Sequence, residues 1–248
     1  MRSHWRPDVV ILSCEHGGNE VPAEYADLFE GARDVLASHR GWDIGALGVA
    51  RRLAELTSFP LFACTFTRLL VEPNRSPDSG KLFSEYTDPL DESAKAAIKH
   101  EYYDRHRNSI ECAIGDAIAA GRRVLHVGVH SCTDELDGHV RELEVSLLFD
   151  PDRPSERDAC DAWNRALSTL EPSWRLPLNE PYQGADDGLT TWLRGRYDER
   201  AYAGVEVEVR QGLILEYADQ RRVGQSLASA LRAALVPLEP PSGTGPPA

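Results

Sequence analysis

Short apolar runs alternate along the chain with longer segments in which apolar residues recur every three or four positions. The short runs are rich in valine, leucine and isoleucine and end at glycine, proline or polar residues, as expected of buried strands. This pattern predicts strands over residues 8–14, 61–66, 69–72, 124–130, 144–149 and 203–209.

The longer segments have helical spacing. They predict helices over residues 45–56, 91–120, 156–170, 190–197 and 211–235. Asp91 is a candidate N-cap of the longest helix and Gly121 is its candidate C-cap. Residues 73–89, rich in Pro, Ser, Asp and Gly, are predicted to be a loop.

The alternation of strands and helices favours an α/β sandwich around a mainly parallel sheet. A chain of 248 residues fits one such domain, here residues 1–236. Residues 237–248 are dominated by proline and glycine and are predicted to be a disordered tail. In parallel sheets, functional side chains gather beyond the carboxyl ends of the strands.

Composition narrows the class of protein. The net charge is −13, which disfavours nucleic acid or an anionic membrane as a partner. Neither a signal-peptide core nor a stretch of ~18 apolar residues occurs. The five cysteines are odd in number and form no CxxC pair, which is typical of reduced thiols. We therefore expect a soluble, cytoplasmic enzyme or binding protein.

The first predicted strand runs directly into His16, which two glycines follow. A histidine in this position faces a cleft with little steric cover, so it is a candidate for metal binding or catalysis. The alternative is a loop histidine without a chemical role.

The strand over residues 124–130 ends at His130, four positions after His126. On a helix this pair would resemble a metal-binding HxxxH motif, but residues four apart on a strand lie ~13 Å from each other. The glutamate that the zincin motif requires is also replaced by Val127. His130 is therefore the candidate and His126 is predicted to be structural.

Residues 205–210 place three polar side chains on one face of a strand and valines on the other. Glu208 is a candidate general base at the mouth of the sheet, although an amphipathic edge strand would show the same pattern. Asn74-Arg75 follows a predicted strand, and an arginine fork is a natural partner of a substrate carboxylate. A surface arginine is the alternative.

Other chemistries leave weaker signals. The chain has neither of the standard glycine-rich phosphate loops nor a GxSxG elbow. A cysteine nucleophile, Cys14 or Cys132, paired with a histidine stays possible, although cysteine beside a strand end usually belongs to the core.

Six segments together resemble the N-formylglutamate amidohydrolase family. They are CEHGGNEVP (14–22), GWDIGA (41–46), TRLLVEPNRS (67–76), VHS (129–131), NEPY (179–182) and VEVEVRQGLI (205–214). They occur in the order of the family and span about residues 9 to 215.

The resemblance implies a three-layer α/β/α sandwich with a mixed, mainly parallel sheet, like that of the zinc carboxypeptidases. It implies one Zn²⁺ per chain, bound by His16 and by His130 of a His-Ser pair. It also implies that Asn74 and Arg75 hold a substrate carboxylate and that Glu208 activates water.

The third metal ligand departs from the carboxypeptidases, because Asn19 stands where those enzymes have a glutamate. The family pattern favours Asp43, and Glu20 is its rival. Glu15 is a weaker candidate, since a side chain next to His16 in an extended segment points away from it.

The implied activity is hydrolysis of the amide of a small N-acyl amino acid such as N-formyl-L-glutamate. Further candidate substrate-binding residues are Arg68, Arg210, Asn179 and Tyr182, and Arg210 is alternatively expected to pair with Glu206 or Glu208. The alternatives are an amidase or carboxypeptidase acting on short peptides or cell-wall fragments, and an inactive protein that binds zinc and an N-acyl amino acid. The oligomeric state is left open.

Overall fold

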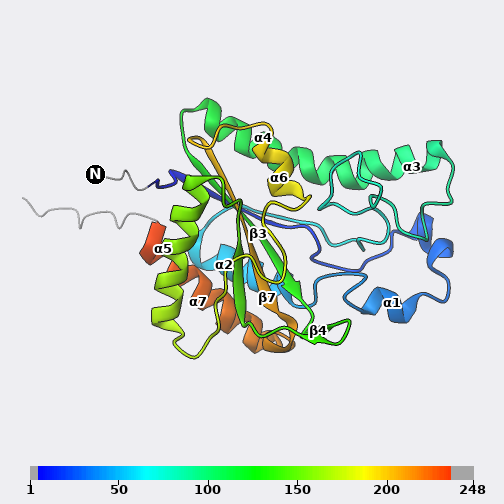
Figure 1. Ribbon diagram of the computed structural model, residues 1–248. Coiled ribbons are helices and arrows are strands. Elements are labelled where there is room, and N and C mark those ends of the chain that lie inside the picture. The colour runs from blue at the N-terminus through cyan, green and yellow to red at the C-terminus, as the bar shows by residue number, and fades with distance from the viewer. Residues whose placement is uncertain (1–4, 236–248) are drawn as a thin grey trace, which may run out of the picture.

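A five-stranded sheet forms the centre of the molecule (Figure 1), a computed structural model that describes residues 5–235. The strands are β1 (Val9–Cys14), β2 (Leu61–Ala63), β3 (Val124–Cys132), β6 (Val145–Leu148) and β7 (Tyr202–Arg210). Their order is β2-β1-β3-β7-β6, and all neighbours are parallel except β6, which runs antiparallel to β7. The prediction of a mixed, mainly parallel sheet is confirmed.

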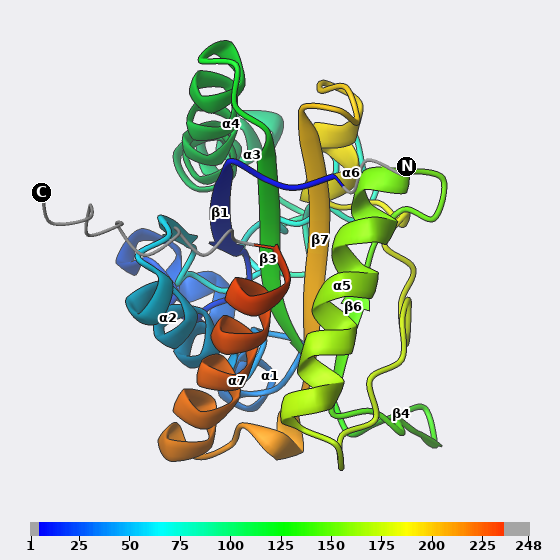
Figure 2. The same ribbon diagram turned by 90° about the vertical axis from the view of Figure 1, so that its left-hand side faces the viewer.

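Helices cover both faces of the sheet (Figures 1 and 2). On one face, α2 (Ala46–Thr57), α5 (Pro154–Leu170) and α7 (Tyr217–Leu235) pack on the main apolar core. On the other face, α4 (Arg105–Ala119) and α6 (Leu189–Arg194) enclose a smaller core. Successive side chains of β1 serve the two cores in turn, because strand side chains alternate between faces. The result is a three-layer sandwich.

The remaining elements surround one end of the sheet. They are η1 (Ala23–Phe29), α1 (Arg33–Ala37), α3 (Glu92–Ile98), η2 (Lys99–Asp104), β4 (Glu135–Leu136), β5 (His139–Val140) and η3 (Gln211–Leu213). The two short strands β4 and β5 form a hairpin.

The longest predicted helix is present as the continuous run of α3, η2 and α4. The Asp91 carboxylate caps it by accepting a hydrogen bond from the Ala94 amide at 2.8 Å. Gly121 ends it with a φ of +73°, a conformation in which glycine carries no steric cost. Both capping predictions are confirmed.

One predicted strand is wrong. Residues 69–72 form a turn and an irregular segment instead of a strand. Their apolar side chains are explained by burial, because Leu69, Leu70 and Val71 pack against α3 in a separate core. Residues 211–235 are largely helical as predicted, with the 3₁₀ turn η3 over residues 211–213 and α7 from Tyr217 to Leu235.

The alternating strand β7 is internal, because it pairs with β3 on one side and β6 on the other. The edge-strand interpretation of residues 205–210 is therefore wrong. The tail predicted over 237–248 lies outside the described residues. Within the part of the chain that the structure covers, no helix has the length and apolar character needed to cross a membrane.

His126 lies fully buried in β3, where its Nε2 contacts Ser13 Oγ at 2.7 Å and its Nδ1 contacts the Tyr202 hydroxyl at 3.0 Å. Burial disfavours the charged imidazolium and lowers the pKa of His126 to about 4. The ordinary pKa of histidine is about 6.5. The unfolded chain therefore binds a proton in this pH window that the folded chain does not.

We predict that the free energy of unfolding falls as the pH is lowered from about 6.5 to about 4, with this group contributing about 3 kcal/mol. In His126→Gln this contribution should disappear, which denaturant titrations at a series of pH values would show. His100→Gln, at an exposed histidine, should retain the dependence. Parallel curves for wild type and His126→Gln would contradict the prediction.

Candidate metal centre and substrate cleft

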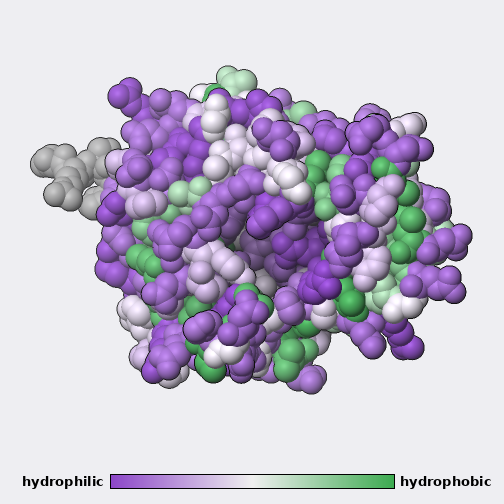
Figure 3. Space-filling view, turned by 45° about the vertical axis from the view of Figure 1, so that its right-hand side comes forward, coloured by the Kyte–Doolittle hydropathy of each residue, from purple (hydrophilic) through white to green (hydrophobic). Residues whose placement is uncertain are grey.

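A polar cleft opens beside the carboxyl ends of β1, β3 and β7. Its volume is about 190 Å³. The space-filling view shows a hollow lined by hydrophilic residues (Figure 3). This is the edge of a parallel sheet at which functional residues are expected.

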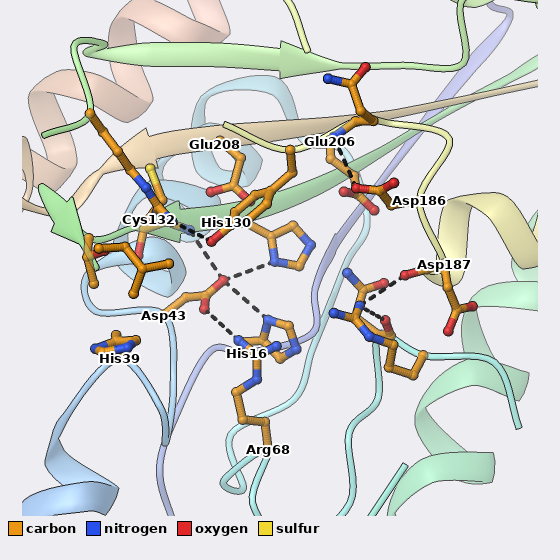
Figure 4. Close-up of a pocket in the computed structure, with 18 residues that line it drawn as sticks. His16, His39, Asp43, Arg68, His130, Cys132, Asp186, Asp187, Glu206 and Glu208 are labelled. Atoms are coloured by element: carbon orange, nitrogen blue, oxygen red, sulfur yellow. Dashed lines mark hydrogen bonds and ion pairs between the residues drawn. The ribbon is translucent and has the colours of Figure 1, made fainter. Parts of the chain in front are cut away.

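The Asp43 carboxylate lies at the centre of the polar side chains in the cleft (Figure 4). Its Oδ2 lies 3.3 Å from His16 Nδ1 and 3.0 Å from His130 Nδ1, and it accepts a hydrogen bond from the Ser131 amide at 3.3 Å. Its Oδ1 accepts a hydrogen bond from Arg68 Nη1 at 3.3 Å. One carboxylate thus links three chain segments that are distant in sequence.

The backbone around His16 explains this convergence. A Cβ atom on Gly18 would lie 2.2 Å from the Thr65 carbonyl oxygen, so only glycine permits this close approach. The Asp43 amide donates to the His16 carbonyl at 2.9 Å, which holds the two loops together. Asp43 makes no side-chain capping bond to α2, so helix capping does not explain an acid at this position.

Each imidazole contacts a second buried carboxylate through its other nitrogen. His16 Nε2 lies 2.5 Å from Glu72 Oε1, and His130 Nε2 lies 3.1 Å from Glu15 Oε2. Both rings therefore direct Nδ1 towards Asp43 and Nε2 towards an acid. A carboxylate behind the ring fixes the tautomer and the orientation of a metal-binding histidine.

In this buried cluster, pairing of opposite charges outweighs the effect of burial on the pKa values of the carboxyl and imidazole groups. Burial alone would raise the pKa of Asp43, but the positive charges of His16 and His130 outweigh it and hold that pKa well below its usual range. The same balance at Glu15, with His130 beside it, holds its carboxyl pKa low. Burial would lower the pKa of His130, but the hydrogen bond to Asp43 and the negative charge of the adjacent Glu15 raise it. The cluster is held together by paired opposite charges.

The donor set fits a divalent metal ion. One ligand atom each from His16, Asp43 and His130 lies within 4.8 Å of the others, and all three residues are buried. Two imidazole nitrogens and one carboxylate oxygen form a typical catalytic zinc set, which leaves a coordination position open. The carboxylates on the far nitrogens are the outer partners that such sites possess.

Glu208 lies beside this cluster on β7, directly opposite His130 in the strand register. Its side chain is buried, and Oε2 has no hydrogen-bond partner among residues 5–235. Burial, reinforced by the carboxylates of Asp43 and Glu206, raises the pKa of Glu208 to about 8. An acid that is destabilised in its charged form and unpartnered is a strong proton acceptor.

The rival metal ligands lie elsewhere. The Glu20 side chain is exposed and its Oε2 accepts a hydrogen bond from Thr65 Oγ1 at 2.9 Å. Glu15 lies behind His130, on the opposite side of the ring from Asp43.

Four of the predicted substrate-binding residues, Asn74, Arg75, Arg68 and Tyr182, line the cleft. Arg68 is bound to Asp43 and to Glu72 Oε2. Arg75 Nη1 donates to the backbone carbonyls of Asn74 and Asp187 at 2.8 and 2.9 Å. Asn74 Oδ1 accepts a hydrogen bond from the Leu189 amide at 2.7 Å, so the Asn74 side chain joins the loop to α6.

The other two predicted substrate-binding residues, Asn179 and Arg210, lie outside the lining of the cleft. The Asn179 side-chain oxygen accepts a hydrogen bond from the Phe149 amide at 2.8 Å. Arg210 pairs with Asp134 and Glu144 rather than with Glu206 or Glu208, so that expected pairing is wrong.

Two residues at the site, Glu72 and Arg141, are absent from the sequence-based candidates. Glu72 ends the segment that was predicted to be a strand. Arg141 follows the β4–β5 hairpin and lines the cleft. The Asp137-Gly138 pair is a hairpin-turn signal that reveals the hairpin but not the direction of the arginine after it.

A sheet with a buried His-Asp-His cluster and an unpartnered glutamate at its carboxyl edge has the architecture of a hydrolase with a candidate metal site. The chain belongs to the N-formylglutamate amidohydrolase family, whose model matches residues 9–215. Membership of this family makes the protein a hydrolase that acts on a small molecule.

Two solved structures share the fold. A gene product of Agrobacterium tumefaciens is similar at 31% identity and a TM-score of 0.78, over 92% of this chain and 91% of that one. The N-formylglutamate amidohydrolase of Ralstonia eutropha JMP134 shares the fold at 18% identity and a TM-score of 0.63, over 94% of each chain. A comparison with curated proteins finds no match.

Metal content tests the cluster directly. We predict one divalent metal ion per wild-type chain and its loss in His16→Ala and in Asp43→Ala, because each change removes one ligand of three. Glu20→Ala should retain the metal, since that carboxylate bonds Thr65 at the surface. Elemental analysis of protein purified without chelator measures this. Metal retained by Asp43→Ala and lost from Glu20→Ala would reverse the choice of the third ligand.

The carboxylate behind His130 allows a second test. Glu15→Gln should weaken metal binding roughly 10–100-fold, because a neutral amide makes the imidazole a poorer donor and holds it less firmly. Competition with a chromophoric chelator measures the dissociation constant. Glu20→Gln, a change of the same kind in the same loop, is the control and should bind metal as the wild type does. Equal affinity in both variants would remove Glu15 from the site.

Proposed function

We propose that the protein is a zinc-dependent amidohydrolase that cleaves the amide bond of a small N-acyl amino acid of the N-formyl-L-glutamate type. The observation that carries the proposal is the buried cluster of His16, Asp43 and His130 with the unpartnered carboxylate of Glu208 beside it. Family membership indicates the reaction class, and the cluster provides candidate metal ligands and a candidate proton acceptor for that reaction.

When bound by His16, Asp43 and His130, a zinc ion would polarise the amide carbonyl and acidify a water molecule. Glu208 accepts the proton of the attacking water at its free Oε2 and delivers it to the leaving amine. Its raised pKa suits both steps, because the carboxyl group then both holds and releases a proton near neutral pH. A His-His-Asp set also tolerates other divalent ions, and metal analysis distinguishes them.

Arg75 holds the carboxylate of the amino acid in this proposal. The contacts of its Nη1 with the carbonyls of Asn74 and Asp187 fix the guanidinium at the wall of the cleft. Arg107 supports the same segment, because its Nη1 donates to the carbonyls of Pro73 and Arg75 at 2.9 and 3.0 Å. A guanidinium held in place loses little entropy when it binds a carboxylate.

The residues around the site support two further parts of the proposal. The five cysteines are all unpaired thiols within residues 5–235, which suits a reducing compartment such as the cytoplasm. His130 on β3 and Glu208 on β7 meet His16 and Asp43 of the adjoining loops at one end of the sheet, which supports a single catalytic domain.

Glu208→Gln separates proton transfer from metal binding. We expect kcat to fall by a factor of roughly 10²–10⁴, because the amide cannot accept a proton, while the metal content stays at the wild-type level. Glu206→Gln, on the same face of β7, should cost far less. Hydrolysis of N-formyl-L-glutamate and elemental analysis are the two measurements. A fully active Glu208→Gln would disprove the general-base assignment.

A further inference from the structure

The arginines of the cleft differ in how far their charge is neutralised. Within residues 5–235, Arg68, Arg75 and Arg141 line the cleft. Arg68 forms ion pairs with two carboxylates, those of Asp43 and Glu72. Arg75 and Arg141 have no carboxylate within 4.0 Å in that part of the chain. Two guanidinium groups therefore face the cleft with unneutralised charge.

These two groups lie at opposite ends of the cleft. Arg141 donates from Nη2 to the Tyr182 hydroxyl at 2.8 Å, and its positive charge acts on the nearby Cys132 thiol, whose pKa burial raises. Arg75 contacts Asp187. Cys132 and Asp187 lie on opposite sides of the His16–Asp43–His130 cluster in Figure 4.

The carboxylates of the cleft wall are unevenly distributed between the two ends. Asp186 and Glu206 lie on the same side as Asp187 in Figure 4, whereas Glu208 lies on the side of Cys132. The end that holds Arg141 therefore has fewer carboxylates than the end that holds Arg75.

The Arg141 end also has an apolar lining. The Tyr182 ring lies beneath the Arg141 guanidinium, 5.0 Å from its central carbon, and Leu136 of β4 lines the same cleft. Together they offer a short apolar surface that ends in a cation. A chain of methylene groups that ends in an anion is complementary to this surface.

The scissile bond connects these observations, and this step rests on the proposed function. If the amide carbonyl lies at the cluster, the acyl part and the amine part of the substrate extend to opposite sides. Arg75 holds the carboxylate of the amino acid, so Arg141 faces the acyl part. A formyl group is a single carbon and does not reach beyond the cluster.

We propose that the preferred substrates are N-acyl amino acids whose acyl group itself ends in a carboxylate, and that Arg141 binds this second carboxylate. The substrate is thus a monoamide of a short dicarboxylic acid, with one anion on each side of the amide bond. Hydrolysis adds one water molecule and yields a free amino acid and a dicarboxylate.

The test compares two acyl groups of similar length, N-succinyl-L-alanine and N-butyryl-L-alanine, which differ chiefly in the terminal carboxylate. For the metal-loaded wild type we expect kcat/KM to favour the succinyl compound by roughly 10–100-fold, the value of a charge-assisted hydrogen bond. In Arg141→Leu this ratio should fall towards one, and in Arg141→Lys it should be partly kept. Arg175→Leu, at an exposed arginine paired with Glu142, should keep the wild-type ratio.

A binding measurement makes the outcome independent of turnover. Titration calorimetry of the same two compounds uses Glu208→Gln, with and without Arg141→Leu, and a melting curve confirms that each variant folds. The expected result is tighter binding of the succinyl compound that depends on Arg141. Equal affinities for the two compounds, or a preference that survives Arg141→Leu, would overturn the proposal.

Two other results have distinct meanings. If Arg141→Leu lowers the preference for N-formyl-L-glutamate over N-formyl-L-alanine and leaves the succinyl preference intact, Arg141 binds a side-chain carboxylate and the proposal is wrong. If the wild type hydrolyses none of these amides, the proposed function fails. The calorimetric preference then decides the binding role of Arg141 alone.

Discussion

The shared Asp43 carboxylate is the interaction on which the site depends. Its Oδ2 contacts both His16 and His130, and its other oxygen binds Arg68. A buried carboxylate is stable only when its charge is paired and its oxygens are hydrogen-bonded, and here the partners come from three separate segments. The contacts that stabilise the buried carboxylate therefore also set the positions of the candidate ligands.

The sequence predicted most of the strands, helices and site residues that follow from the spacing of apolar residues. It predicted few of the side-chain positions that depend on the path of the loops. His130 was predicted from its position at a strand end, and Glu208 from the strict alternation of polar and apolar residues. Both positions follow from the backbone geometry of a strand. The run over 69–72 was misassigned because an apolar segment packed in a satellite core has the composition of a strand. Glu72 and Arg141 were not predicted because the partners of a loop side chain are determined by tertiary packing.

The hairpin that carries Arg141 is attached to the same strand as Glu208. Asp134 Oδ1 accepts hydrogen bonds from Arg210 Nη1 at 3.3 Å and from the Gly212 amide at 2.9 Å, while its carbonyl accepts from the Arg141 amide at 2.8 Å. Arg210 thus helps to position Arg141 at the cleft by holding Asp134 at the base of the hairpin. The end of β7 therefore carries the proposed proton acceptor and also anchors the segment that leads to the proposed acyl-binding arginine, while the tip of the hairpin is exposed.

The alternation of β7 has a consequence for how this enzyme diverges. Val205, Val207 and Val209 belong to the main core, whereas Glu206 and Glu208 face the cleft. A substitution at the outward position 206 alters the recognition surface and leaves core packing intact. An inserted or deleted residue in this strand would exchange the two faces at once, burying the acids and exposing the valines. The recognition surface of β7 can therefore change by replacement of single residues, whereas a change in its length would disrupt both faces.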